Sequence, residues 1–512
     1  MMKRLLSLKW ILAGLLLLSG LSACVEKPTP EDPETDPTVT DKRTLVGVNY
    51  FAANCMSLYY LWADDLKSVL RSWLNQELET DPFNKVLSIR YKKNGQDYDR
   101  WTQLTDAFDE MESSVEGVST TYGCDIVLMR LDKNYICAVV TIVYKDSPAA
   151  KAGLKRGDVI VKVNGKAMTN NDYYAIATEE FLYSSSCTIT LMDPATGNPG
   201  SPISMSAVKM YEDPVVYHSI FEVGGKKVGY LVYTAFTTRS IDALLGVCEH
   251  FKAAGISELV LDLRYNGGGY VIAEEALASM LAPEANVLAG DLFEQEVYNT
   301  ALTEYFLKQD KNALKTFFKT KFSWEEGNAT NHCDTRSGHL DLNRIYAIID
   351  SGTASASESL LVGLMPYMDI TLIGQQTHGK FCTGIMYGAQ EWYDDYKSEV
   401  GNNWYGYRKD VQDWGLYLMI GRYADRNGNC PAMPDGLIPS IQVEDRPDLG
   451  YDFGDERDPM LRQALILAGR TDLHAVASTR AAGRADRTPE QVVKPAFGKR
   501  ILDPDRIPGL QR

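Results

Sequence analysis

The alternation of apolar strands with amphipathic helices between about residues 214 and 470 constrains the fold of this chain more than any other feature. KVGYLVYTAF and ELVLDL have the apolar character of buried strands, and between them SIDALLGVCEHFKAAG is an amphipathic helix that ends at Gly255. Farther along, RIYAIID, SESLLVGLM and ITLIG repeat the order strand, helix, strand. This alternation predicts α/β layers with parallel strand pairs. Two charged, aromatic segments, about 283–340 and 388–428, interrupt it and are expected to be surface insertions or lids.

The region from about 116 to 213 has short strands and tight turns instead. ICAVVTIV is a strand, and in the stretch DSPAAKAGLKRGDVIVKVNG Pro148 begins a short helix that Gly153 ends. VIVKV is a further strand, and Asn164–Gly165 makes a tight hairpin after it. This order resembles a PDZ domain, a fold that binds an extended peptide C-terminus as an added strand.

The resemblance to PDZ domains implies which loop would hold a peptide carboxylate. The stretch YGCDI places Tyr122, Gly123, Cys124 and Asp125 at that loop, although it departs from the commonest Gly-Leu-Gly-Phe form. Two roles stay open for the domain: it binds peptides, or it only braces its neighbour.

The first 24 residues have the features of an export signal. Lys3 and Arg4 precede a short apolar core, and small residues and Cys24 follow it. LSAC resembles the bacterial lipobox, which implies that Cys24 is the lipidated first residue of the mature chain; an ordinary cleaved signal is the alternative. Residues 25–43 are rich in Pro, Thr and acidic side chains, so we expect a disordered tether between a lipid anchor and the folded domains.

Composition excludes several classes of protein. The 512 residues are 45% hydrophobic, enough for several globular domains, and their formal charge of −16 argues against nucleic-acid binding. The eight cysteines other than Cys24 are scattered without a CxxC or Cys/His cluster, so neither a zinc site nor another metal or cofactor is expected.

The segments on either side of the predicted domains differ in character. Residues 44–115 have the spacing of apolar residues that is typical of helices. The basic tail at 471–512 is expected to be poorly ordered.

Three motifs in the α/β region carry groups that suit acyl transfer. DLRYNGGG, residues 262–269, places glycines at the end of a buried strand, where backbone N–H groups can approach a ligand. SGTASASES, residues 351–359, lies between a strand and a helix, which puts a hydroxyl at a helix N-terminus where developing negative charge is favoured. QQTHGKFCTG carries Lys380, which can act as a base if burial removes its proton. Taken singly, these motifs read as a turn, a capped helix and a loop lysine.

Together the three motifs resemble those of the C-terminal processing peptidases, or tail-specific proteases. In that family a motif like S-A-S-A-S-E supplies the nucleophile and a motif like T-F-G-K-G supplies a lysine base 25 residues downstream. The matching positions are Ser355 in TASASE and Lys380 in THGK, which are also 25 residues apart. The family has a PDZ domain before the catalytic core, a D-L-R-x-N-x-G-G motif at the oxyanion site, and a closing strand segment that DGLIPSIQVED, residues 435–445, resembles.

The resemblance implies a fold and a site. We expect an α/β and α+β multidomain protein with a helical segment at 44–115, a PDZ domain at 116–213 and a ClpP- or crotonase-like serine peptidase core at 214–470. Ser355 would be the nucleophile and Lys380 the base. The N–H groups of Ala356 and of Gly268, from the run Gly267–Gly269, would hold the oxyanion. His378 is expected to be a loop residue that this route does not need.

One position departs from the family pattern. Many members have Gln four residues after the lysine, where it orients the lysine; this chain has Gly384. The orienting group is then Glu358, Thr383 or another residue, or it is absent.

The leading hypothesis is a lipid-anchored serine endopeptidase of the bacterial cell envelope, at the periplasmic face of the inner membrane or at the outer membrane or surface. Its partner would be a protein substrate, held through its C-terminus by the PDZ domain, which recruits it or gates the site. The alternatives are a non-catalytic ligand- or peptide-binding lipoprotein, with the aromatic segment at 388–428 lining a groove, and an esterase that uses the same dyad.

Overall fold

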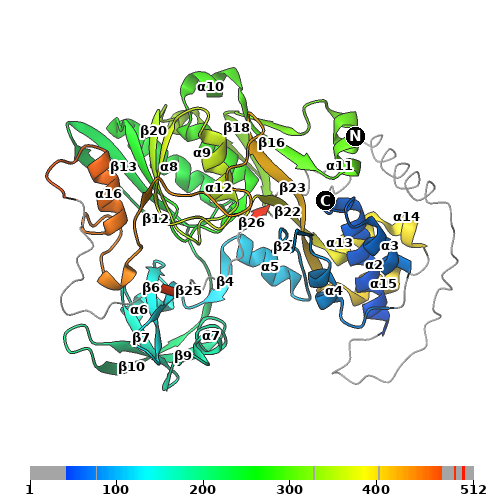
Figure 1. The fold of residues 1–512 in the computed structure, drawn as a ribbon, viewed down its shortest axis with the longest axis horizontal. Coiled ribbons are helices and arrows are strands. Elements are labelled where there is room, and N and C mark those ends of the chain that lie inside the picture. The colour runs from blue at the N-terminus through cyan, green and yellow to red at the C-terminus, as the bar shows by residue number, and fades with distance from the viewer. Residues whose placement is uncertain are drawn as a thin grey trace.

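The computed structural model describes residues 42–75, 78–326, 329–401, 404–474, 489–491 and 499–501. The export signal, Cys24 and the expected tether as far as residue 41 lie outside the described residues. Within the described ranges no helix has the length and apolar character needed to cross a membrane. Figure 1 shows an α/β region at the upper left, a smaller strand-rich region below it, and a cluster of helices at the right.

A six-stranded, mostly parallel sheet forms the centre of the α/β region. Its order is β12 (Val215–Val223), β13 (Lys226–Tyr233), β14 (Glu258–Asp262), β20 (Arg344–Ile349), β21 (Asp369–Gly374) and β24 (Ile441–Gln442). Only β12 is antiparallel to its neighbour; the other five strands run parallel. The parallel α/β layers predicted from the alternation are therefore confirmed, and the late segment 435–445 contributes β24 at the edge.

Helices cover both faces of this sheet because side chains on each strand alternate between two apolar cores. Leu231 of β13 lies in the core with α8 (Ser240–Ala254), α9 (Val271–Leu281) and α12 (Ala356–Leu364). The neighbouring Tyr230 and Val232 lie in the core with α16 (Pro459–Leu467). As predicted, α8 ends at Gly255, which adopts a left-handed φ of 74°.

A second sheet lies beside the first and contains a strand from the C-terminal tail. Its order is β15 (Gly268–Tyr270), β26 (Lys499–Ile501), β22 (Cys382–Gly388), β23 (Gly415–Asp425), β16 (Leu292–Tyr298) and β17 (Lys315–Phe317), with β3 (Gln103–Thr105) on β23. The tail was expected to be poorly ordered; most of it lies outside the described residues, but β25 (Pro489–Gln491) and β26 are strands that composition did not predict.

The strand-rich region below the α/β layers has the PDZ-like elements that the sequence predicts. Its main sheet has the order β10 (Pro199–Ser206), β9 (Ser186–Met192), β7 (Val159–Val163), β6 (Ile136–Val143), β5 (Cys124–Arg130) and β25. The short helix α6 spans Pro148–Lys151, and Asn164 and Gly165 both have positive φ in the turn after β7.

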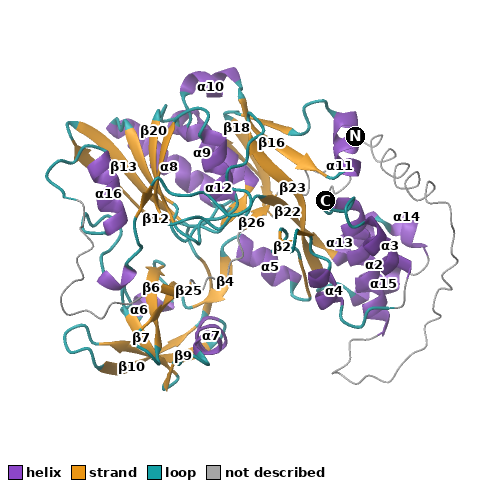
Figure 2. Ribbon diagram, viewed as in Figure 1, coloured by secondary structure: helices purple, strands orange, loops and turns teal. Residues whose placement is uncertain are grey.

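The helices at the right combine the N-terminal segment with the second insertion (Figure 2). They are α2 (Lys42–Tyr59), α3 (Lys67–Asn75), α4 (Pro82–Ser88), α5 (Phe108–Val115), α13 (Ala389–Asp395), α14 (Lys397–Val400) and α15 (Trp404–Asp410). Trp392 packs edge-on against Phe51 of α2 and stacks on Tyr396, and all three side chains are buried. The expectation of a surface insertion or lid at 388–428 is therefore wrong for these aromatics, because the N-terminal helices cover them.

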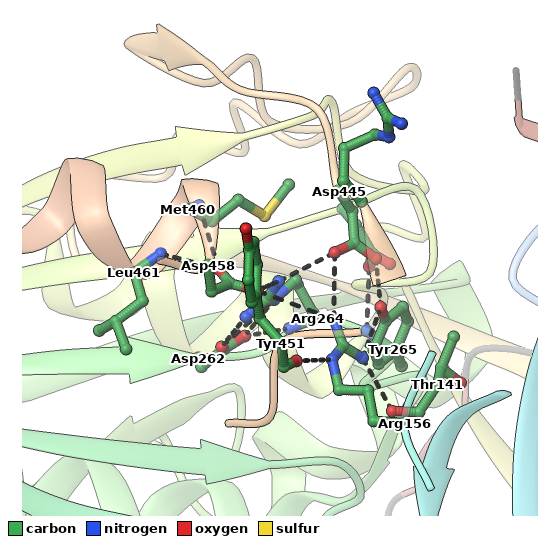
Figure 3. A network of polar contacts seen from close by, with 12 residues as sticks. Thr141, Arg156, Asp262, Arg264, Tyr265, Asp445, Tyr451, Asp458, Met460 and Leu461 are labelled. Atoms are coloured by element: carbon green, nitrogen blue, oxygen red, sulfur yellow. Dashed lines mark hydrogen bonds and ion pairs between the residues drawn. The ribbon is translucent and has the colours of Figure 1, made fainter. Parts of the chain in front are cut away.

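A buried ion network joins the PDZ-like region to the α/β layers (Figure 3). Arg264 bonds Asp262 at 2.7 Å, Asp445 at 2.9 Å and Asp458 at 3.0 Å. Arg156, which comes from the PDZ-like region, approaches Asp445 at 3.3 Å and donates to the Thr141 carbonyl at 2.8 Å. Removing one partner from a buried ion network is strongly destabilising, because it leaves an uncompensated charge. The network therefore fixes the PDZ-like region against the end of β14, which leads into Gly268.

Candidate active site

The three motifs singled out in the sequence meet at one edge of the central sheet. DLRYNGGG follows β14, SGTASASES follows β20, and QQTHGKFCTG follows β21, and these strands are parallel neighbours. The carboxyl ends of parallel strands share one edge of a sheet, which is where α/β proteins place their sites. Two backbone hydrogen bonds join the motifs: Ala354 N–H donates to the Asn266 carbonyl at 3.0 Å, and His378 N–H donates to the Thr353 carbonyl at 2.9 Å.

Ser355 stands at the N-terminus of α12 in a strained conformation. Its φ is 63° and its ψ is −113°, a combination that costs a residue with a side chain on the order of 1–3 kcal/mol. The residue is fully buried, and its Oγ has no hydrogen-bond partner among the described residues. Ser355 is also the N-cap of α12, in a capping box with Glu358. A buried hydroxyl next to the positive end of a helix has the features of a nucleophile as well.

The Glu358 carboxylate joins the serine segment to the lysine segment. Its Oε2 accepts the backbone N–H of Ser355 at 2.9 Å and the backbone N–H of Lys380 at 2.8 Å. Its Oε1 accepts the N–H of Gly379 at 2.7 Å and the hydroxyl of Thr377. The amide nitrogens of Ser355 and Lys380 bond the same oxygen, so their separation cannot exceed the sum of 2.9 and 2.8 Å. Glu358 therefore holds the two segments together.

Burial and hydrogen bonding act on Glu358 in opposite directions. Desolvation raises the pKa of this fully buried carboxyl above its ordinary value, while the bonds from Thr377, Ser355, Gly379 and Lys380 lower it. The carboxylate form has four donors aimed at its two oxygens, and a protonated carboxyl would place a hydrogen against one of them. The Glu358 side chain thus supports the backbone of both segments, which is a different role from orienting the lysine amine.

Lys380 is completely buried, and its amine lies against two aromatic side chains. Its Nζ donates to the Tyr417 hydroxyl at 2.5 Å and lies 4.8 Å from the centre of the Tyr417 ring and 5.8 Å from that of Trp101. Tyr417 comes from β23, and Trp101 comes from the N-terminal segment just before β3. The group that the lysine amine bonds is therefore a tyrosine on the strand next to β22.

Gly384 and Tyr417 are sterically linked. A Cβ atom on Gly384 would lie 2.6 Å from Cε2 of Tyr417, closer than real Cβ contacts allow. Any larger residue at position 384 would therefore displace the tyrosine ring that reaches Lys380. The sequence did not reveal Tyr417, because it lies in the apolar run WGLYLMI and has the pattern of a core residue. Of the other candidates, Thr383 donates to Glu296 at 2.9 Å.

The glycine run is positioned beside the serine turn, but one of its N–H groups is already bonded. Gly268 N–H donates to the Asn266 side chain at 2.9 Å. Gly269 has a φ of 146°, and a Cβ there would lie 2.1 Å from the Phe236 carbonyl oxygen, so a glycine is needed for this close backbone approach. Ala356, the first residue of α12, follows Ser355 directly. The choice of Gly268 as an oxyanion donor stays a prediction that requires its bond to Asn266 to open.

His378 lies close to the lysine and is held as a neutral ring. The Trp101 indole N–H approaches its Nε2 at 3.4 Å, and Arg100 donates to its carbonyl at 3.0 Å. Burial, followed by the charges of Arg100 and Lys380, lowers the pKa of His378 to about 4. A ring with this pKa stays neutral through the physiological range and is a weak proton acceptor, in keeping with the expected loop role.

The proposed carboxylate loop of the PDZ-like region is packed and acidic. The Tyr122 ring stacks on Phe181 at 5.5 Å, and the Tyr144 hydroxyl donates to the Asp125 carboxylate at 3.1 Å. Desolvation and the charge of Asp125 raise the pKa of Glu212 to about 7, so two carboxyl groups lie near this end of β5.

Comparison with known families agrees with this architecture. The model of peptidase family S41 matches residues 227–443, and the model of the PDZ domain matches residues 139–176. The chain therefore has a segment similar to peptidase family S41, and a segment similar to the PDZ domain precedes it. The family resemblance and the mixed α/β multidomain fold predicted from the motifs are both confirmed.

The relatives share this family description. The chain is 25% identical over 275 residues to carboxy-terminal processing protease CtpB of Bacillus subtilis (strain 168), covering 53% of this chain and 48% of CtpB. It is 27% identical over 252 residues to CtpA of the same organism, covering 49% and 45%. The chain thus spans about half the length of the curated relatives it matches. A solved putative S41 protease from Bacteroides fragilis NCTC 9343 covers 86% of this chain and 99% of its own, with 21% identity and a TM-score of 0.58, so the two share a fold.

Substitution Glu358→Gln tests whether the carboxylate holds the two segments. A glutamine has one acceptor oxygen and one NH₂ group, so two of the four donors lose their acceptor, and each buried donor left unpaired costs about 1–3 kcal/mol. Removing the buried charge offsets part of this cost, and we expect a net loss of about 2 kcal/mol in the free energy of unfolding, measured by urea denaturation. The exposed Glu304→Gln on α11 (Thr300–Gln309) is the control and should change stability by less than about 0.5 kcal/mol. Equal stability of the two variants would contradict the assigned role.

Proposed function

We propose that this chain is a serine endopeptidase of the C-terminal processing type, anchored in the bacterial cell envelope, with Ser355 as nucleophile and Lys380 as base. The observation that carries the proposal is the shared Glu358 carboxylate, which brings a buried, unpartnered serine hydroxyl and a buried lysine to the same sheet edge. The match to peptidase family S41 and the similarity to the two Bacillus processing proteases support it.

The proposed reaction begins with proton transfer from the serine to the lysine. A neutral Lys380 amine accepts the proton of Ser355 Oγ as the oxygen attacks the peptide carbonyl. The N–H of Ala356 and one N–H of the run Gly267–Gly269 stabilise the oxyanion. Lys380 then returns the proton to the leaving amine, and water releases the acyl group from Ser355.

Tyr417 takes the place of the third member of the site. A neutral amine has one lone pair and two hydrogens, so it can donate to the Tyr417 hydroxyl and still use its lone pair to accept the Ser355 proton. The bond to Tyr417 limits the rotation of the long lysine side chain and directs the lone pair, which is the task of an orienting group. Glu358 positions the backbone of Lys380 instead, through the amide N–H.

The PDZ domain is proposed to bring protein substrates to the site, by recruiting their C-terminal segments or by gating. Arg156 of the PDZ domain contacts Asp445, and Asp445 also contacts Arg264, which lies just before the glycine run. These buried contacts connect the PDZ domain to the glycine run, which supports either role. The ligand-carrier alternative has lost its main support, because the aromatics Trp392, Tyr393 and Tyr396 are buried between helices.

The peptidase proposal is tested with the chain from residue 42 onward and an unfolded protein as substrate. We expect cleavage by this protein, and at least a 1,000-fold lower kcat/KM for Ser355→Ala and for Lys380→Ala, since each change removes a reacting group. His378→Gln serves as the matched control and should retain most of the activity. No cleavage by the unmodified protein, or equal cleavage by the Ser355 and Lys380 variants, would contradict the proposal.

The role of Tyr417 is tested by Tyr417→Phe, which removes only the hydroxyl that accepts from Lys380. We expect kcat to fall about 10- to 100-fold with KM nearly unchanged, because a positioning group acts on the chemical step more than on binding. Tyr387→Phe on β22 is the control: it removes a buried hydroxyl that bonds Asp395, away from the lysine. If kcat of the Tyr417 variant equals that of the control, the assigned role is wrong.

The envelope location rests on the signal and the LSAC motif before residue 25. We expect Cys24→Ala to move the protein from the membrane fraction to the soluble fraction, because the thiol that would carry the lipid is gone. Fractionation of bacteria that express each form, with the full-length protein followed by immunoblot, measures this. Membrane recovery of the Cys24 variant equal to that of the unmodified protein would contradict the lipid anchor.

A further inference from the structure

A strand from the C-terminal tail lies between the two strands that flank the candidate active site. β26 runs parallel to β15, pairing Lys499 with Gly268 and Ile501 with Tyr270. Its Ile501 also pairs with Gly384 of β22. Neighbouring strands are about 4.8 Å apart, so the space between β15 and β22 has the width of one extended peptide. We call this space the catalytic slot.

The catalytic slot adjoins the proposed nucleophile. β15 continues the glycine run, β22 begins just after Lys380, and the Asn266 carbonyl before β15 accepts from Ala354 N–H at 3.0 Å and from Ser357 Oγ at 3.1 Å. Ser355 lies between these two donors in the chain. An extended peptide in the slot pairs its backbone with strands on both sides, which is how strand addition binds peptides without regard to most side chains.

A second strand of the tail lies on the PDZ sheet. β25 runs antiparallel to β5, pairing Pro489 with Met129 and Gln491 with Leu128. Without β25, β5 would be the edge of its sheet, and strand addition at such an edge is how PDZ domains bind peptides. Antiparallel pairing directs the tail from Met129 toward the acidic end of β5 at Asp125. Figure 1 shows β25 at the PDZ-like region and β26 beside β22.

We propose that the C-terminal tail of this chain is an intramolecular occupant of its own substrate path, with β25 on the PDZ edge and β26 in the catalytic slot. β25 and β26 belong to one tail, in which Gln491 and Lys499 are eight positions apart. This proposal rests on the proposed function, since it makes the slot the place where substrate peptides lie. The tail then competes with every other peptide for the site.

Charge and tethering both favour this occupant. Residues 471–512 contain eight Lys and Arg against five Asp and Glu, whereas the whole chain has an acidic excess of 16. A basic tail is therefore attracted to the acidic remainder of the chain, including the Asp125 carboxylate near the end of β5. A tethered segment acts at an effective concentration in the millimolar range, so it raises the apparent KM of a competing peptide without any regulatory partner.

The experiment removes the pairing capacity of β26 by the double substitution Arg500→Pro and Ile501→Pro. Successive residues of a strand donate to opposite neighbours, and proline donates none, so pairing with both β15 and β22 is lost. The readout is hydrogen–deuterium exchange of the Gly269 amide and of the amides at 384–385, because Gly268 N–H bonds Asn266, Tyr270 N–H bonds Phe236, and the rest of β22 pairs with β23. It is measured in the full chain with Ser355→Ala so that cleavage plays no part. We expect exchange to quicken at least tenfold in this variant, and to stay unchanged in the control Ala481→Pro, which places a proline in the tail outside both strands. Unchanged exchange in the double variant would overturn the proposal.

Two further readouts separate the possible failures. With Ser355 present, the double variant should cleave an unfolded protein with an apparent KM at least fivefold lower and an unchanged kcat. If no variant cleaves, the peptidase proposal fails while the exchange result still decides the position of the tail. If the protection of the Gly269 amide disappears on dilution, the strand comes from a second copy of the chain, and the intramolecular proposal is wrong.

Discussion

The site depends on one buried carboxylate. Glu358 accepts backbone N–H groups from the serine segment and from the lysine segment on the same oxygen atom, and two more donors from 377–379 on the other. Burial raises the pKa of this group, and the four donors favour the charged form, so the carboxylate and its surroundings stabilise one another. Without this acceptor, the turn with strained φ at Ser355 and the loop before β22 would lose four hydrogen bonds and keep the one from His378 N–H to the Thr353 carbonyl.

Much of this arrangement could be predicted from the sequence, because it depends on residues that lie close together in the chain. The alternation of strands and helices specifies a parallel sheet, and the positions of Ser355, Lys380 and the glycine run directly after strands place them at one edge. The role of Tyr417 could not be predicted, since it depends on the register between β22 and β23 and on the space left by Gly384. The burial of the aromatics near Trp392 depends on the N-terminal helices, which are more than 300 positions away in the chain, and local pattern carries no information about that contact.

The PDZ domain and the tail extend the site beyond the three motifs. The ion network of Arg156 and Arg264 fixes the PDZ domain at the start of the segment that leads to the glycine run, and the tail pairs with both domains. A peptide that lies on β5 and continues into the slot between β15 and β22 would touch each part in turn. The tail composition gave no sign of this pairing, because strand addition is recognised through the backbone and leaves little trace in side-chain pattern.

The most direct test of the account is to trap the acyl group on the enzyme. The full chain is mixed with a peptide thioester, quenched in acid during the first turnover, digested, and examined by mass spectrometry. We expect one acylated residue, Ser355, and a strongly reduced adduct in Lys380→Ala, because the lysine must take the proton of the attacking hydroxyl. An acyl group on another residue, or equal acylation of Ser355 with and without Lys380, would contradict it.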